Sequence, residues 1–203
     1  MSAGALLYPD DLILLPQAAK LCGVDFKTME GWIDGVGLAS RLRAERSPVT
    51  QHFQMHATDL FSFLKKNNKP IPEALGLMEK KRILVVDDEA NMLSAIRRVF
   101  LDSPESVYAF ETAGDGFEAG QKIERFRPHL VILDIWMPKM DGFKLCSWIK
   151  QNPKTRNTKI LAISGLVKKE DQRIAVDFGA DDFLEKPFEN EILKEHALRL
   201  LPA

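Results

Sequence analysis

The chain has 203 residues, a formal net charge of −1 at pH 7, and 45% hydrophobic and 28% charged residues. This composition is that of an ordinary globular protein of one or two domains, and the near-neutral charge supplies no bulk attraction to nucleic acid or to an anionic membrane. No apolar run approaches the length of a membrane-spanning helix, Met1–Gly4 lack the basic residues that open a secretory signal, and Cys22 and Cys146 have no metal-ligand spacing. We therefore expect a cytoplasmic protein with reduced thiols and no membrane partner.

The first elements expected are two short helices separated by a glycine-containing turn. Pro16 suits the first turn of a helix that ends at Gly23. Asp25 is placed to cap a second helix, which carries Met29 and Trp32 on one side. Helix, turn and helix in succession are typical of a helix-turn-helix.

A hairpin and a third helix are expected next. Residues 41–45 and 52–55 flank Ser47-Pro48 and predict a small hairpin, and the apolar spacing over residues 59–65 predicts the helix. These elements, with the string Pro16-Gln17-Ala18-Ala19-Lys20-Leu21-Cys22-Gly23-Val24, resemble the winged helix-turn-helix of the excisionase and mercury-regulator (MerR) families. The resemblance implies a domain over residues 1–66 whose second helix enters the DNA major groove and whose hairpin contacts the backbone.

The charge of this module departs from that family pattern. Residues 1–78 contain as many Lys and Arg residues as Asp and Glu residues, eight of each, and the second helix offers only Lys27 as a base. DNA affinity depends on phosphate neutralisation, so a protein-docking adaptor stays open as an alternative. The candidate DNA contacts lie on the second helix and in the wing: Lys27, Thr28, Arg41, Arg43 and Arg46.

A boundary follows the third predicted helix. The segment Asn67–Glu73 combines polar residues with two prolines, and each proline biases the residue before it away from helix. We predict a linker over residues 67–80 and a second domain over residues 81–203.

In the second domain, apolar strands alternate with amphipathic helices. Strands are predicted at residues 83–86, 107–112, 130–133, 160–163 and 182–184, and helices at residues 90–101, 117–126, 143–149, 174–178 and 192–201. Five successive β–α units predict a parallel sheet. The first, third and fourth strands are almost entirely apolar, which indicates burial on both faces.

Reactive side chains follow four of these strands: Asp87, Asp88, Asp134, Ser164 and Lys186. The carboxyl ends of parallel strands share one edge of a sheet, so we expect these groups to converge there. Three carboxylates, a hydroxyl and an ammonium suit a divalent cation and transfer of a phosphoryl group to a carboxylate.

Residues 81–203 resemble the receiver domain of bacterial two-component response regulators. The strings that carry the resemblance are Val86-Asp87-Asp88-Glu89, Ile163-Ser164-Gly165, Leu133-Asp134-Ile135-Trp136-Met137-Pro138-Lys139-Met140-Asp141-Gly142 and Asp182-Phe183-Leu184-Glu185-Lys186-Pro187-Phe188. The resemblance implies an α/β flavodoxin-like (CheY-like) fold with a five-stranded parallel sheet of strand order 2-1-3-4-5.

The resemblance also implies a role for each site residue. Asp134 would be phosphorylated, and Mg²⁺ would bind Asp88 and Asp134 directly, Asp87 through water, and the Trp136 backbone carbonyl. Ser164 would hydrogen-bond the phosphoryl group, Lys186 would pair with it, and Phe183 would be the aromatic switch. The Lys186–Pro187 bond would be cis. A haloacid-dehalogenase-like phosphatase is disfavoured, because such enzymes place a second Asp two residues after the nucleophile, where this chain has Trp136.

We therefore expect a phosphorylation-dependent response regulator whose partner is a sensor histidine kinase or a phosphotransfer protein. It would control transcription through the first domain and form a homodimer on phosphorylation. It would not be an enzyme beyond slow loss of its own phosphoryl group. The alternatives are a receiver joined to a protein-docking adaptor, and a shuttle that passes its phosphoryl group onward.

Overall fold

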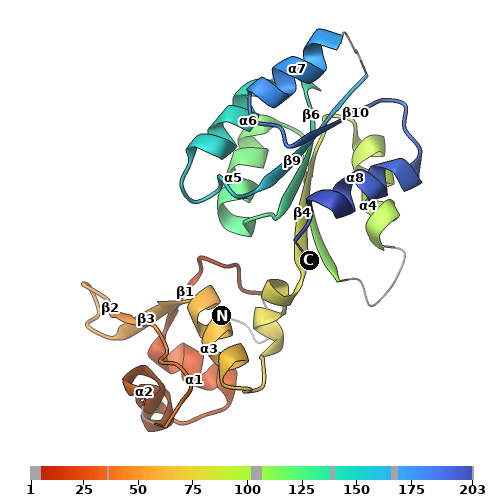
Figure 1. Ribbon diagram of the computed structural model, residues 1–203. Coiled ribbons are helices and arrows are strands. Elements are labelled where there is room, and N and C mark those ends of the chain that lie inside the picture. Colours follow the sequence, from red (N-terminus) through yellow and green to blue (C-terminus); the bar gives the residue numbers. More distant parts are fainter. Residues whose placement is uncertain (1–5, 36, 102–106, 138–139, 166–168, 203) are drawn as a thin grey trace. The chain divides into compact units, whose positions relative to one another are not determined.

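The computed structural model describes residues 6–35, 37–101, 107–137, 140–165 and 169–202 (Figure 1). The chain divides into two compact units, Met1–Glu79 and Lys80–Ala203, and each unit has a hydrophobic core of its own. None of the helices in the described part of the chain combines the length and the apolar character that a membrane crossing requires.

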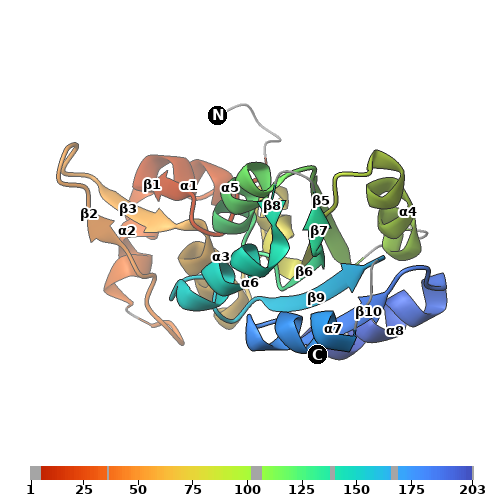
Figure 2. The same ribbon diagram turned by 90° about the horizontal axis from the view of Figure 1, so that it is seen from above.

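The described residues of the first unit form a small antiparallel sheet with three α-helices and a 3₁₀ helix. The strands are β1 (Leu12–Leu14), β2 (Glu45–Arg46) and β3 (Phe53–His56), and the α-helices are α1 (Leu15–Cys22), α2 (Phe26–Asp34) and α3 (Ala57–Lys66). The sheet order is β1-β3-β2, so β3 is the central strand. Strands β2 and β3 form a hairpin that projects from the rest of the unit (Figure 2).

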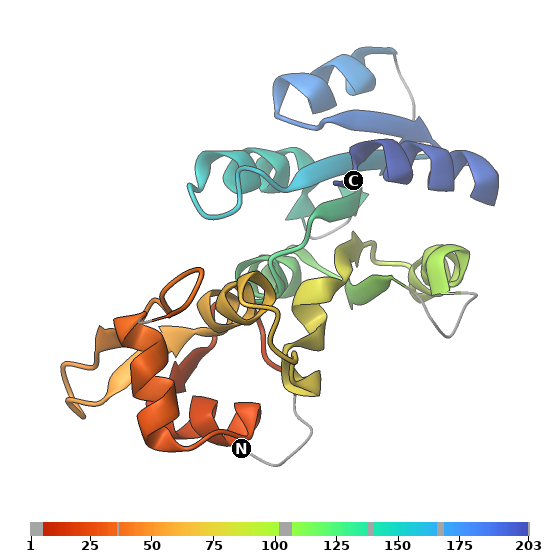
Figure 3. The ribbon, with the colours of Figure 1, turned by 60° about the horizontal axis from the view of Figure 1, so that its bottom comes forward.

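A short turn joins α1 to α2 (Figure 3). Gly23 ends α1 in the left-handed region, with φ at 64°, which glycine adopts at little cost. The Asp25 side chain then caps α2 by accepting a hydrogen bond from the Thr28 N–H at 2.8 Å. These contacts form the two helices and the turn that the sequence predicts.

The segment predicted as a linker belongs instead to the first unit. It contains the 3₁₀ helix η1 (Glu73–Glu79), in which Leu75 is fully buried in the core of that unit. The Leu7 N–H donates a hydrogen bond of 2.7 Å to the Ala74 carbonyl, which joins the segment to the start of the chain. The prolines do exclude an α-helix here, but the apolar residues that follow them are drawn into the core.

The second unit is a doubly wound α/β fold. Its strands are β4 (Lys81–Val86), β5 (Tyr108–Ala113), β6 (Leu130–Asp134), β9 (Lys159–Ser164) and β10 (Asp182–Glu185). Its helices are α4 (Ala90–Leu101), α5 (Gly116–Phe126), α6 (Gly142–Gln151), α7 (Lys169–Asp177) and α8 (Asn190–Leu200). The five strands pair in parallel in the order β5-β4-β6-β9-β10, so the predicted order 2-1-3-4-5 is confirmed.

Both faces of this sheet are covered. Helices α4 and α8 pack on one face, and α5, α6 and α7 lie on the other (Figure 1). Along β4, Ile83 and Val85 join the core under α4 and α8, while Leu84 and Val86, which point the other way, are equally buried. Burial on both faces explains why this strand is a continuous apolar run.

Candidate functional site

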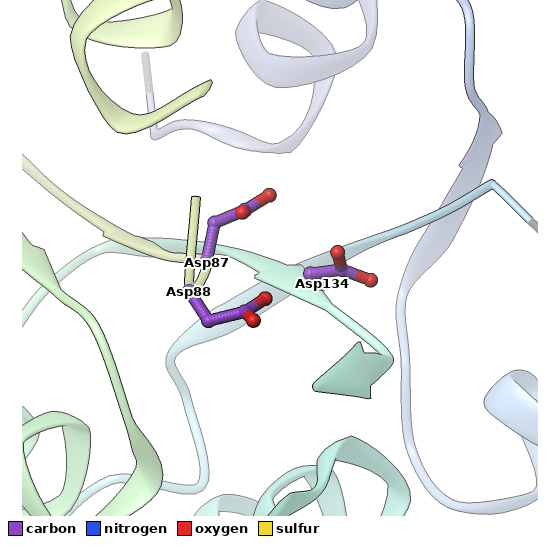
Figure 4. Close-up of side chains that lie close together, drawn as sticks. All are labelled: Asp87, Asp88 and Asp134. Atoms are coloured by element: carbon purple, nitrogen blue, oxygen red, sulfur yellow. The ribbon is translucent and has the colours of Figure 1, made fainter. Parts of the chain in front are cut away.

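Three carboxylates meet at the carboxyl ends of β4 and β6, the neighbouring strands at which the strand order changes direction (Figure 4). Asp87 follows β4 and is fully buried, Asp134 is the last residue of β6 and is 7% exposed, and Asp88 is exposed. One oxygen from each carboxylate lies within 4.8 Å of the others. The convergence predicted from strand ends is therefore present in the fold.

Lys186, which follows β10, bridges two of these carboxylates. Its Nζ atom lies 2.8 Å from Asp87 Oδ2 and 2.8 Å from Asp134 Oδ2, and its side chain is 14% exposed. Burial by itself lowers the pKa of the ammonium, but the hydrogen bonds and charges of Asp134 and Asp87 outweigh burial, so the pKa lies above its ordinary value. Lys186 is therefore fully charged at neutral pH.

The charge balance of this cluster suits a hard cation. Three carboxylates face one ammonium, which leaves two negative charges at a partly buried edge of the sheet. Carboxylate oxygens are the ligands that Mg²⁺ prefers, and a divalent cation would neutralise the remaining charge. The residues present fit such an ion.

Backbone N–H groups orient the two buried carboxylates. Asp87 Oδ1 accepts from the Glu89 N–H at 2.8 Å, and Asp134 Oδ1 accepts from the Trp136 N–H at 3.0 Å. Each buried carboxylate thus uses one oxygen for the main chain and the other for Lys186. The receiver resemblance implies a role for the Trp136 carbonyl but not for this N–H donor, because a backbone donor leaves no mark on residue identity.

The remaining predicted receiver residues lie on the adjoining strands. Ser164 ends β9 with its side chain fully buried, and its carbonyl accepts from the Lys186 N–H at 2.7 Å. Phe183 lies on β10 and is 8% exposed, so its ring is in a buried position. The Lys186–Pro187 peptide bond is cis.

A short hairpin follows the last residue of β6. It pairs β7 (Trp136–Met137) with β8 (Met140–Asp141), and Pro138 and Lys139 of the predicted consensus loop lie outside the described residues. Gly142 closes this loop against the strand: a Cβ atom built there would lie 2.7 Å from Ile135 Cα and 3.0 Å from the Asp134 carbonyl oxygen. The sequence suggests only an ordinary helix-entry glycine, whereas the fold needs one at this position.

The candidate DNA contacts of the first unit differ in whether their side chains already have partners within the unit. Lys27 is exposed on α2, but the Thr28 hydroxyl donates to Asp25 at 2.9 Å and so serves the helix cap. Arg41 and Arg43 are exposed and precede β2, so they lie outside the paired part of the hairpin in which the sequence places them.

Arg46 lies on the hairpin and has local partners. Its guanidinium carbon is 4.5 Å from the centre of the Phe53 ring, and its Nη1 donates to the Gln51 carbonyl at 3.1 Å. The described contacts therefore give Arg46 a structural role in the hairpin.

Residues 83–198 match the family model described as "Response regulator receiver domain". Among curated proteins, the chain is 37% identical over 113 residues to "Probable transcriptional regulator ycf27" of Porphyridium aerugineum, a match that covers 55% of this chain and 44% of that protein. It is 35% identical over 108 residues to "Alkaline phosphatase synthesis transcriptional regulatory protein PhoP" of Bacillus subtilis, covering 53% of this chain and 43% of that protein. The matched part is therefore less than half of either relative.

Solved structures give the same result for the second unit's fold. A signal receiver domain from Bermanella marisrubri is 44% identical, with a TM-score of 0.54, and the match covers 60% of this chain and 98% of that one. The receiver domain of a protein titled "DNA binding response regulator protein (merR)" from Colwellia psychrerythraea 34H is 28% identical, with a TM-score of 0.52, and the match covers 59% of this chain and 96% of that one.

Proposed function

The chain belongs to the response regulator receiver domain family, and from this premise we propose that Asp134 accepts a phosphoryl group and that the first unit delivers the output. The observation that carries the proposal is the double ion pair of Lys186 with Asp134 and Asp87 beside the exposed Asp88. The proposed nucleophile, the proposed cation ligands and the lysine proposed to bind the phosphoryl oxygens therefore lie close together.

In the proposed transfer, an Asp134 carboxylate oxygen forms a bond to phosphorus while the bond between phosphorus and the donor breaks. The electrons of the broken bond stay with the leaving group. If the donor is a kinase phosphohistidine, the leaving group is an imidazole nitrogen, which then gains a proton. If the donor is acetyl phosphate, the leaving group is acetate. Lys186 exchanges a carboxylate partner for a phosphoryl oxygen. Ser164 donates its hydroxyl to another oxygen, and the position of the Phe183 ring responds to that movement.

Mg²⁺ is the proposed cofactor, with Asp88 and Asp134 as direct ligands, Asp87 bound through water and the Trp136 carbonyl as a further ligand. When bound, a divalent cation neutralises the carboxylates and the incoming phosphoryl oxygens, which would otherwise repel each other. Asp87 is the most deeply buried of the three carboxylates, whereas Asp88 is exposed, and this difference favours an indirect role for Asp87 and a direct one for Asp88.

The phosphorylation proposal is tested by incubating the full chain with acetyl phosphate and Mg²⁺ and measuring intact mass. We expect one phosphoryl group on the wild type and none on Asp134→Asn, which keeps the side-chain volume but removes the nucleophile. Asp177→Asn, the same chemical change at an exposed position on α7, serves as the control and should be labelled like the wild type. Labelling of Asp134→Asn would refute the assignment.

We propose that the output is DNA binding and transcriptional control in the cytoplasm. The support is the helix, Gly23 turn, helix and hairpin of the first unit, and the names of several relatives as transcriptional regulators. The partners would be a sensor histidine kinase or a phosphotransfer protein. Phosphorylation would promote a homodimer through α7, β10 and α8, which light scattering before and after phosphorylation would detect as a rise in mass.

A protein-docking adaptor is the second candidate, because Arg46 is held within the hairpin while Val49 at its tip is 88% exposed and Phe26 at the start of α2 is 46% exposed. An ionic-strength series of binding to random duplex DNA separates the two outputs. A steep salt dependence supports DNA output, and no binding at low salt supports docking. A phosphorelay shuttle would instead transfer its phosphoryl group to a histidine phosphotransfer protein.

A further inference from the structure

A pocket of about 330 Å³ lies at the end of the second unit's sheet that is remote from Asp134. It is lined by residues that precede β6 and begin β9, among them His129, Thr158 and Lys159. The charged side chains that line it, as far as the structure describes them, are Arg127, Lys154 and Lys159, all of them cations. Such a site favours an anion.

The protonation of His129 follows from its hydrogen bonds. Its Nδ1 accepts the backbone N–H of Arg82 at 3.0 Å, so Nδ1 carries no proton. Burial, and then the charges of Arg82 and Lys81, lower the pKa of His129 to about 4, so the ring is neutral at pH 7 and its proton is on Nε2.

A second donor faces that proton. Arg82 Nη2 lies 3.3 Å from His129 Nε2, and a guanidinium nitrogen can only donate. Two donors therefore point at one another, an arrangement that buried polar groups avoid unless an acceptor lies within reach of both. Of these two residues His129 lines the pocket, so an acceptor oxygen bound there would receive its Nε2 proton.

Arg82 also lacks a counter-charge in the described part of the chain. It is 9% exposed, its Nε donates to the Arg127 carbonyl at 2.9 Å, and none of the ion pairs among the described residues includes Arg82 or Lys154. By contrast, Lys159 pairs with Asp181 at 2.8 Å. A guanidinium stays charged even when burial lowers its pKa, and a buried charge without a partner is costly.

We propose that this pocket binds a phosphate group, one of whose oxygens accepts the Nε2 proton of His129. The negative charge of the phosphate would face Lys154 in the lining and the buried guanidinium of Arg82, which adjoins His129 Nε2. A phosphate dianion balances the two positive charges that have no carboxylate partner among the described residues. Inorganic phosphate and a free phosphate monoester supply this charge, and a nucleic-acid backbone supplies the same oxygens with one negative charge per phosphate. This site is separate from Asp134, since it lies at the opposite ends of β6 and β9.

The test is a titration of the full-length, ¹⁵N-labelled protein with inorganic phosphate, without divalent cations, followed by NMR of the imidazole nitrogens. His129→Gln identifies the His129 signals among the four histidines. We expect a saturable shift of those signals that sodium chloride of equal ionic strength does not produce. Adenosine 5′-monophosphate and a short DNA duplex, added separately, distinguish a free ester from a backbone phosphate.

Charge variants sharpen this test. Lys154→Gln should weaken phosphate binding about threefold, as for one exposed charge, and Arg82→Gln about tenfold, as for a buried charge next to the ligand's partner His129. Lys194→Gln, which removes an exposed charge on α8 outside the pocket lining, should leave the affinity unchanged. If Arg82→Gln fails to fold, the affinity of Lys154→Gln and the His129 signals of the wild type still show whether the pocket binds phosphate. No saturable shift with any of the three probes, or equal affinity of the folded variants and the control, would overturn the proposal.

Discussion

Lys186 Nζ lies 2.8 Å from Asp134 Oδ2, although the two residues are 52 positions apart in the sequence. The lysine therefore pairs with the carboxylate that we propose as the nucleophile, and it pairs with Asp87 at the same time. This contact fastens the end of β10 to the ends of β6 and β4. Phosphorylation of Asp134 would replace a carboxylate partner of Lys186 by a phosphoryl group, which links the chemistry to the position of β10.

Loss of Lys186 should destabilise the second unit. Lys186→Gln leaves Asp87 and Asp134, whose side chains are 0% and 10% exposed, without a cation, and we expect a loss of about 3 kcal/mol in the free energy of unfolding. Urea denaturation at pH 7 without divalent cations measures it. Lys194→Gln should change the free energy by no more than about 0.5 kcal/mol. Mg²⁺ should restore part of the loss, and equal stability of the two variants would contradict the ion-pair account.

Asp88 should control the affinity for Mg²⁺. Asp88→Asn removes one proposed direct ligand, so we expect binding to weaken about tenfold or more. Trp136, whose backbone N–H donates to Asp134 and whose side chain is 51% exposed, should report binding through its fluorescence. Trp136→Phe identifies this signal among the three tryptophans of the chain. An unchanged midpoint in Asp88→Asn would exclude Asp88 as a ligand.

Asp181 should contribute to stability above mildly acidic pH. Burial raises the pKa of its carboxyl, but hydrogen bonds from Lys150, Lys159 and the Ile160 N–H outweigh burial and hold the pKa below its ordinary value of 3.8. The stabilisation is therefore complete above pH 3.8 and is lost as the pH falls through the lowered value. Asp181→Asn should be less stable by about 1 kcal/mol at pH 7, and the difference should vanish in acid. A difference independent of pH, measured by urea denaturation, would contradict this origin.

Gly142 should not tolerate a side chain. Gly142→Ala would place Cβ 2.7 Å from Ile135 Cα, and the necessary backbone shift should cost about 2 kcal/mol and slow the labelling of Asp134. Gly120→Ala is the matched control. Gly120 lies within α5, and a Cβ atom built there meets nothing within 4 Å. That variant should gain about 0.5–1 kcal/mol from helix propensity. Thermal unfolding measures the stability of both variants. If Gly142→Ala and Gly120→Ala change the stability in the same direction, the steric argument is refuted.

The exposed arginines of the first unit should carry its phosphate contacts if the output is DNA binding. Replacing Arg41 and Arg43 together by alanine should reduce the salt slope of duplex binding by about two units, since each neutralised phosphate accounts for about 0.9 of the slope. Lys65→Ala with Lys66→Ala removes the same charge from α3 and should change the slope less. Fluorescence anisotropy at several salt concentrations measures the slopes. Equal slopes for both double variants would favour the docking adaptor.

The sheet and the convergence at the site could be predicted because both depend on local patterns. Continuous apolar runs such as residues 130–133, which precede Asp134, indicate buried parallel strands, and parallel strands place the residues at their carboxyl ends at one edge. Asp87, Asp134 and Lys186 therefore meet where strand ends require it.

Other features depend on contacts between distant residues and could not be predicted in this way. Strand β1 is not among the predicted elements, because Leu12–Leu14 show no alternation and form a strand only by pairing with β3. The 3₁₀ helix Glu73–Glu79 falls in the predicted linker, because its prolines are visible in the sequence while the core that receives Leu75 is not. The stacking of Arg46 on Phe53 likewise requires the register of the hairpin.

The bridging lysine gives the resting protein an internal counter-ion. Because Lys186 already neutralises part of the carboxylate cluster, we expect the second unit to fold without a bound metal. If Mg²⁺ is the cofactor, as proposed, the amount of folded protein would not depend on divalent cations, whereas phosphorylation of Asp134 would. A cell could then keep a constant amount of folded protein and limit its phosphorylation through the concentration of divalent cations.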